Sequence, residues 1–185
     1  MNEIERRTFM QGAALTLAFS VGGAEVMLTP RQAHAQNIPL QTLTPDQGAT
    51  LDAVGETLVP GAKAAGISNF VDHQITVPPE QSLLQARILS VRPPFANLYR
   101  AALGAIDGAS SKIKGKKFAE LTPDEQHDFI DAMRQNKIDG WQGPPGPFVY
   151  NVLRSDAVDV VYATMDGYAM LGVPYMPHIA PTQKW

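Results

Sequence analysis

The 185-residue chain contains no cysteine. This absence excludes disulfide bonds, thiolate zinc sites, iron–sulfur ligation by this chain and a cysteine nucleophile. Covalent attachment of haem c is excluded too, because it needs a Cys-x-x-Cys-His segment. Small secreted domains often depend on disulfides. This chain must therefore be held together by core packing or by a partner.

Sequence motifs of catalysis and cofactor binding are also missing. There is no His-Glu-x-x-His segment, no Gly-x-Ser-x-Gly segment and no Gly-x-Gly-x-x-Gly after a strand. The run Asp124, Glu125, Asp128 and Asp131 could serve acid–base chemistry in a small hydrolase, but carboxylates in the first half of a helix also suit its dipole. His127 beside them is a weak pattern for a metal. We expect no catalytic residue, cofactor or metal ligand in this chain.

Charge of either sign is limited. The chain has 15 Lys and Arg against 18 Asp and Glu, a net charge of −3. The basic cluster Lys112, Lys114, Lys116 and Lys117 stands where a helix is expected to end, and cations there suit the helix dipole. We therefore expect no nucleic-acid partner, because such proteins carry a basic face.

The first 35 residues have the order of a secretory signal. Arg6 and Arg7 precede an uncharged apolar run over 12–24, and the small-x-small triplet 33–35 follows. The paired arginines are typical of a twin-arginine signal, which exports proteins already folded. The run is too short to span a membrane, which needs about 20 apolar residues. We expect cleavage after Ala35, which leaves a domain over 36–185 in the periplasm.

Helical periodicity dominates the rest of the chain, and no alternating run is long enough to predict a strand. Thr44 and Thr122 each begin a capping box that contains a proline, which predicts two helix starts. The clearest helix covers 95–113, where apolar residues recur at three- and four-residue steps.

Three further helices are predicted with less regular patterns. Ser68 is expected to cap a short helix, and another is expected over 80–91. A helix over 148–171 should be interrupted near Ser155 and Asp156, either of which could cap a new start. The sequence thus predicts an all-α single domain of six or seven helices, with Pro-rich connections and an extended C-terminal tail.

The C-terminal end combines prolines with large apolar side chains. A stiff, extended segment loses little entropy when it docks on a partner. Whether it docks or folds back on its own domain stays open. The residues expected at a partner interface are Trp141, Pro174, Tyr175, Met176, Pro177, His178, Ile179 and Trp185.

Another class of function remains as an alternative. His178 lies near Met170 and Met176, whose soft sulfur atoms copper would accept. On this hypothesis the chain is a self-sufficient periplasmic binding or metal-handling protein.

Several segments resemble the gluconate 2-dehydrogenase subunit 3 family. They are LTPDQ at 43–47, LDAVGETLVPG at 51–61, AAGI at 64–67, FVD at 70–72 and LTPDEQ at 121–126. Gly167, Tyr168, Gly172 and Pro174 also fit, and a twin-arginine signal is typical of the family.

The resemblance implies a small subunit without a cofactor of its own. Its partner would be a large subunit of the glucose–methanol–choline oxidoreductase type, which carries FAD and oxidises a sugar, sugar acid or polyol. A multihaem cytochrome c, with haem c, often takes the electrons. The small subunit would chaperone the flavoprotein and carry it through the twin-arginine translocase, and any membrane association would come only through partners.

Overall fold

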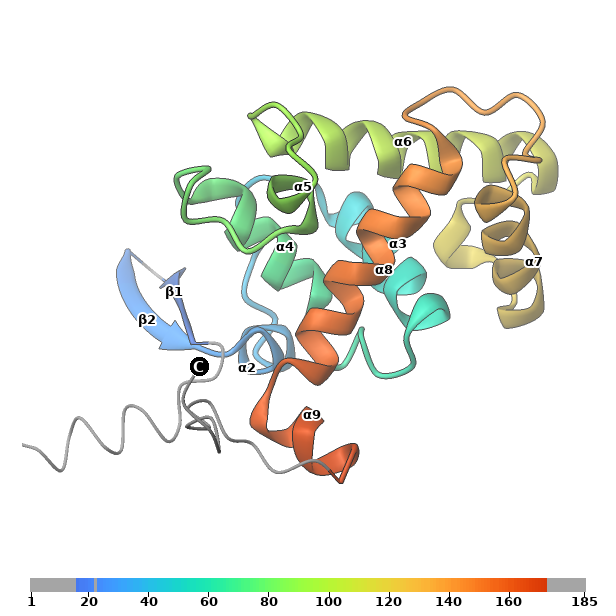
Figure 1. The fold of residues 1–185 in the computed structure, drawn as a ribbon. Coiled ribbons are helices and arrows are strands. Elements are labelled where there is room, and N and C mark those ends of the chain that lie inside the picture. Colours follow the sequence, from blue (N-terminus) through green and yellow to red (C-terminus); the bar gives the residue numbers. More distant parts are fainter. Residues whose placement is uncertain (1–15, 22, 173–185) are drawn as a thin grey trace, which may run out of the picture.

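The computed structural model of the chain describes residues 16–21 and 23–172 (Figure 1). Arg6 and Arg7 lie outside the described residues, as does the predicted tail interface from Pro174 to Trp185. The predictions made for these residues therefore stay predictions.

The described chain begins with a small β-hairpin and a short helix, and helices follow. The elements are β1 (Leu17–Val21), β2 (Ala24–Leu28), α2 (Pro30–Ala35), α3 (Pro45–Leu58), α4 (Ile67–Thr76), α5 (Gln85–Ile88), α6 (Phe95–Lys114), the 3-10 turn η1 (Phe118–Glu120), α7 (Pro123–Arg134), α8 (Gly146–Tyr162) and α9 (Met165–Met170). The predicted all-α class is confirmed. The seven α-helices described between residues 36 and 172 also agree with the predicted number.

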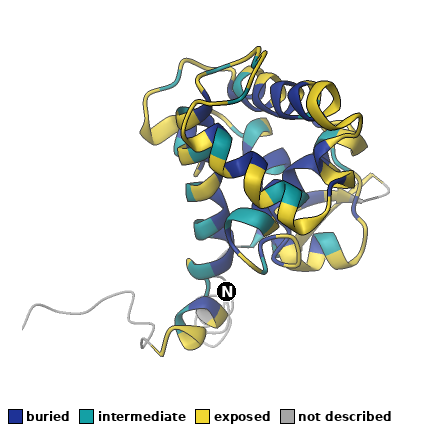
Figure 2. Cartoon of the chain, turned by 90° about the vertical axis from the view of Figure 1, so that its right-hand side faces the viewer, coloured by how far each residue is buried: buried dark blue, intermediate teal, exposed yellow. Residues whose placement is uncertain are grey.

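Helix α8 runs through the middle of the domain (Figure 1) and contacts α3, α4, α5 and α7. Helix α6 lies across one side, and its inward face is buried while its outer face is exposed (Figure 2). The largest fully buried side chains include Tyr99, Phe70 and Phe118. No helix in the described ranges is long and apolar enough to cross a membrane.

The two capping boxes predicted from the sequence are confirmed. Thr44 receives a hydrogen bond from the Gln47 N–H at 3.2 Å, and Thr122 caps α7 in the same way through Glu125. Each box satisfies amide groups that a helix start would otherwise leave unpaired.

Four local predictions are wrong. The helix expected over 80–91 shrinks to the single turn α5. The segment before it is held in an irregular form by Gln74, whose carbonyl accepts from the Ser82 hydroxyl and whose side-chain oxygen accepts from the Leu83 N–H. Helix α4 is capped by Gly66 at φ 82°, and Ser68 is buried inside it. Helix α8 continues through Ser155 and Asp156 and ends at Tyr162. Residues 17–21 and 24–28 form two strands, where none was predicted.

Candidate functional site

The N-terminal segment packs onto the domain as a β-hairpin, although no strand was predicted. Strands β1 and β2 pair antiparallel, with Leu17 opposite Leu28, and both side chains are buried in the common core. Phe19 is buried beside His73 of α4, with ring centroids 5.4 Å apart. Burial lowers the pKa of His73, and a hydrogen bond with the Ala18 backbone opposes this shift. The described part of the expected apolar run, residues 16–21 and 23–24, thus belongs to the packed structure.

Helix α2 contains the expected cleavage site and is closed at both ends. Thr29 and Gln32 form its capping box, with N–H to side-chain oxygen distances of 2.9 and 3.2 Å. Its last turn closes through Asn37, in the left-handed region at φ 53°. The Asn37 N–H donates to the His34 carbonyl at 3.0 Å, and the Ile38 N–H donates to the Ala33 carbonyl at 2.9 Å. This is a Schellman motif.

A signal for α2 was present in the sequence. Residues 29–32 read TPRQ, the same Thr-Pro-x-Gln pattern as TPDQ at 44–47. The composition of a signal peptide concealed it, because a small-residue cleavage triplet and a short Ala-rich helix look alike.

Gly66 brings the body of the domain against the start of α2. At φ 82° it adopts a conformation that favours glycine. A Cβ atom on Gly66 would also overlap the carbonyl group of Pro30 and would come within 3.0 Å of the Arg31 nitrogen. This position therefore needs glycine for two reasons, and one of them exists only because α2 is docked.

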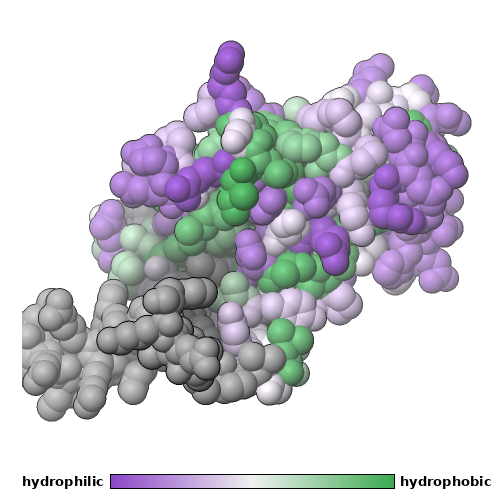
Figure 3. All heavy atoms as spheres, viewed as in Figure 1, coloured by the Kyte–Doolittle hydropathy of each residue, from purple (hydrophilic) through white to green (hydrophobic). Residues whose placement is uncertain are grey.

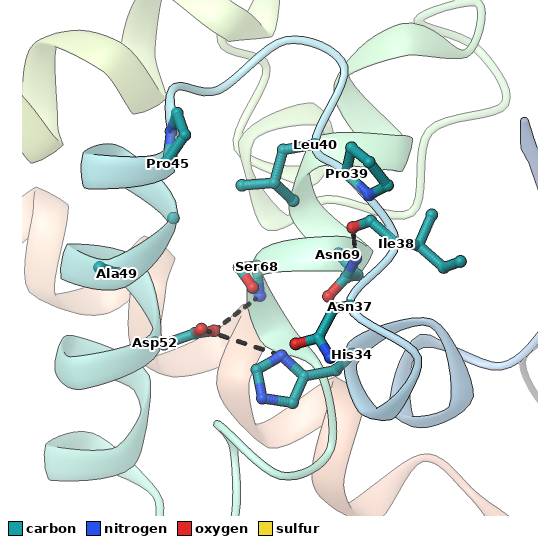
Figure 4. Close-up of a pocket in the computed structure, with 11 residues that line it drawn as sticks. His34, Asn37, Ile38, Pro39, Leu40, Pro45, Ala49, Asp52, Ser68 and Asn69 are labelled. Carbon is teal, nitrogen blue, oxygen red and sulfur yellow. Dashed lines mark hydrogen bonds and ion pairs between the residues drawn. The ribbon is translucent and has the colours of Figure 1, made fainter. Parts of the chain in front are cut away.

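A pocket of about 370 Å³ lies between the end of α2, the following segment, α3 and α4 (Figure 4). His34, Asn37, Asp52, Ser68 and Asn69 supply its polar lining. The His34 Nδ1 atom lies 3.9 Å from the Asp52 Oδ2 atom, and the Ser68 N–H donates to the Asp52 carboxylate at 3.3 Å.

Burial raises the pKa of Asp52, while hydrogen bonding from Ser68 and the nearby His34 oppose this shift. Serine, histidine and aspartate thus meet in this pocket. Ser68, however, is bonded to Asp52 rather than to His34, so the order of a Ser-His-Asp triad is not formed. The arrangement instead fixes the N-terminal segment to α3 and α4.

Asp72 fixes the segment that links α2 to α3. Its carboxylate accepts hydrogen bonds from the backbone N–H groups of Gln41, Thr42 and Leu43 at 2.6, 2.8 and 2.7 Å. Three bonds to one buried carboxylate define the path of this segment. The sequence singled out Asp72 only as part of the FVD segment, and its role as an anchor was not foreseen.

A second buried carboxylate joins three helices. Asp156 of α8 has no exposed surface, and its carboxylate accepts from the Tyr99 hydroxyl of α6 at 2.5 Å and from the Gln85 N–H of α5 at 2.8 Å. Burial raises the pKa of Asp156 to about 7, against the opposing effect of these two donors. Burial also raises the pKa of the Tyr99 hydroxyl.

The remaining residues singled out in the sequence lie apart from the pocket. Asp124, Asp128, Asp131 and His127 are exposed on α7, and Asp131 pairs with Arg134 at 2.6 Å. The described ranges hold no group of three or more potential metal ligands.

Trp141 is half-buried against the core, and its indole N–H donates to the Pro144 carbonyl at 2.7 Å. Its predicted interface role stays a prediction. Met170 is exposed, while its suggested partners Met176 and His178 lie outside the described residues.

Large apolar side chains are exposed around α5. Leu83, Ile88 and Leu89 show 48%, 66% and 39% of their surface. Figure 3 shows an apolar area over this part of the molecule, bordered by polar side chains. Apolar patches with polar rims are typical of protein–protein contact sites.

Comparison with known families identifies the chain. The family model described as gluconate 2-dehydrogenase subunit 3 matches residues 45–175. No curated protein and no solved structure gives a significant match. The matched part covers α3 to α9, the helical body against which the hairpin and α2 pack. The chain belongs to the gluconate 2-dehydrogenase subunit 3 family, which is named for one subunit of a dehydrogenase complex.

Proposed function

We propose that this chain is the non-catalytic small subunit of an FAD-dependent dehydrogenase that oxidises a sugar, sugar acid or polyol. The observation that carries the proposal is the family match over residues 45–175. The FAD belongs to the large subunit, of the glucose–methanol–choline oxidoreductase type, and haem c to a multihaem cytochrome c that receives the electrons.

The role of the small subunit in this proposal is to stabilise the flavoprotein and to carry it to the periplasm. The adjacent Arg6 and Arg7 are typical of a twin-arginine signal and so support this route. The twin-arginine route exports proteins that are already folded. A folded complex could then be exported with one signal for two chains.

The exposed apolar side chains around α5 favour a stable contact with a second protein chain. Leu83, Ile88 and Leu89 lie together near α5, and burying them against a second chain removes apolar area from water. We therefore place part of the subunit contact on this surface, defined as the α5 patch, in addition to the predicted tail residues and Trp141.

Charged substitutions on the α5 patch test the contact. The full chain, tagged and purified from its own cells, is compared with Leu83→Asp/Ile88→Asp and with the control Ile113→Asp. Ile113 is 48% exposed, as Leu83 is, but lies in the last turns of α6. We expect the α5 patch variant to lose most of the copurifying flavoprotein, since a buried unpaired charge is costly. Ile113→Asp should retain it. Equal recovery in all three preparations would exclude the α5 patch from the contact.

A further inference from the structure

We propose that the N-terminal segment controls its own removal. When residues 16–21 and 23–35 are docked on the domain, the Ala35–Gln36 bond is held at the hydrogen-bonded end of α2, and it is cut only after α2 undocks. The proposal rests on the export role proposed above for this segment, and goes beyond it by making the docked segment a conformational switch for processing.

The backbone around this bond is not in a form that a protease can use. Proteases cut exposed, locally unfolded segments far more readily than helices, because the chain must extend into the cleft of the protease. Here the bond lies at the end of α2. Extending the chain here would break four backbone hydrogen bonds of 2.9–3.0 Å. They are Ala33 N–H to Thr29 O, Gln36 N–H to Gln32 O, Asn37 N–H to His34 O and Ile38 N–H to Ala33 O.

The side chain of the third residue before the bond, Ala33, is inaccessible as well. Small residues at this position and at Ala35 define the cleavage site, because both must enter the peptidase. Ala35 is exposed, whereas Ala33 has no exposed surface and belongs to the core. Ala33 reaches a peptidase only if α2 leaves the domain.

Three contacts hold the segment on the domain. Phe19 packs against His73, His34 lies beside Asp52, and Gly66 lies in close contact with the Pro30 carbonyl group. Undocking would expose Leu17, Phe19, Leu28 and Ala33 to water, which opposes release. A translocase or membrane that binds the apolar run would supply the competing interaction.

A matched pair of glycine substitutions tests the switch without altering the signal. Gly66→Ala introduces a Cβ atom that overlaps Pro30, whereas Gly61→Ala has nothing within 4 Å of the new atom. Both glycines have positive φ, 82° and 93°, so a side chain is unfavourable for the backbone at both positions. Only Gly66→Ala pushes α2 away.

The purified full-length chain is incubated with signal peptidase, and the product that begins at Gln36 is measured by intact mass. A synthetic peptide covering 25–45 serves as the unstructured reference. Because cleavage follows the population of the open form, we expect the native chain to be cut at least about tenfold more slowly than the peptide. Gly66→Ala should be cut at least about tenfold faster than Gly61→Ala, which should resemble the native chain.

A second pair of variants controls for the possibility that Gly66→Ala unfolds the whole domain. Phe19→Ser removes a buried side chain of the hairpin, and Val26→Ser removes one that is 39% exposed. Only the first should accelerate cleavage, with the helical circular dichroism of the domain retained. Cleavage of the native chain as fast as the peptide, or equal rates within both pairs, would overturn the proposal. Neither result depends on a flavoprotein partner, so the proposed function would be unaffected.

Discussion

Replacing Asp156 with asparagine should change how the stability of the domain depends on pH. Asp156 is buried at the junction of α5, α6 and α8, where Tyr99 and Gln85 donate hydrogen bonds to it. Burial raises its pKa from 3.8 to about 7. The folded state therefore binds a proton more tightly than the unfolded chain does.

The sign of the effect follows from this difference. Between pH 3.8 and about 7 the folded state holds the proton and the unfolded state has lost it. The contribution of Asp156 to stability is thus fully present below pH 3.8 and is lost as the pH rises through 7. The two pKa values correspond to a total of about 4 kcal/mol, of which about 2.5 kcal/mol falls between pH 5 and pH 8.

Urea unfolding of the native chain and of Asp156→Asn, measured from pH 5 to pH 8, provides the assay. Asparagine has one side-chain oxygen where aspartate has two, so either the Tyr99 hydroxyl or the Gln85 N–H loses its acceptor, and the variant should be less stable at pH 5 by about 1–2 kcal/mol. As the pH rises, the difference should shift by about 2.5 kcal/mol in favour of the variant. Asp128→Asn, an exposed change of the same charge, is the control. A difference independent of pH, or titration of the Asp156 carboxyl carbon near pH 4 by NMR, would refute this reasoning.

Three other predictions follow from the structure and the sequence. Asp72→Asn should destabilise the domain by about 2–3 kcal/mol in urea unfolding, because a neutral amide replaces a carboxylate that accepts three backbone bonds; a change below 0.5 kcal/mol would contradict the anchoring role. Deleting 174–185 should weaken recovery of the flavoprotein while leaving the circular dichroism of the domain nearly unchanged, and a loss of helix would assign the tail to the core. Replacing Arg6 and Arg7 with lysine should leave both subunits in the cytoplasmic fraction, and an active flavoprotein in the periplasm would argue against the carrier role.

The parts of the fold that local chemistry decides were predictable. The capping boxes at Thr44 and Thr122 are local hydrogen-bond patterns, and the stripe of α6 is a strong helical period. The capping boxes and the α6 helix are present in the folded domain because the tertiary contacts agree with these local preferences.

The errors arose where tertiary contacts decide. Apolar residues over 17–28 carry no period, and only pairing between β1 and β2 and packing of Phe19 make them strands. Asp156 resembled a helix cap, yet it stands on the apolar stripe of α8 beside Ala157 and Val160, and donors from two distant helices permit its burial. The pocket, too, combines residues up to 35 positions apart, from His34 to Asn69, that no local pattern connects.

The composition of the purified complex tests the proposed function most directly. The tagged full-length chain is isolated from its own cells, copurifying polypeptides are identified, and released FAD is measured by fluorescence. We predict a large FAD-carrying dehydrogenase subunit in about equal amount. Oxidation of sugars, sugar acids or polyols should reside in the complex, and the separated small subunit should be colourless and inactive. A chain that copurifies with no flavoprotein, or that oxidises such substrates alone, would contradict the account.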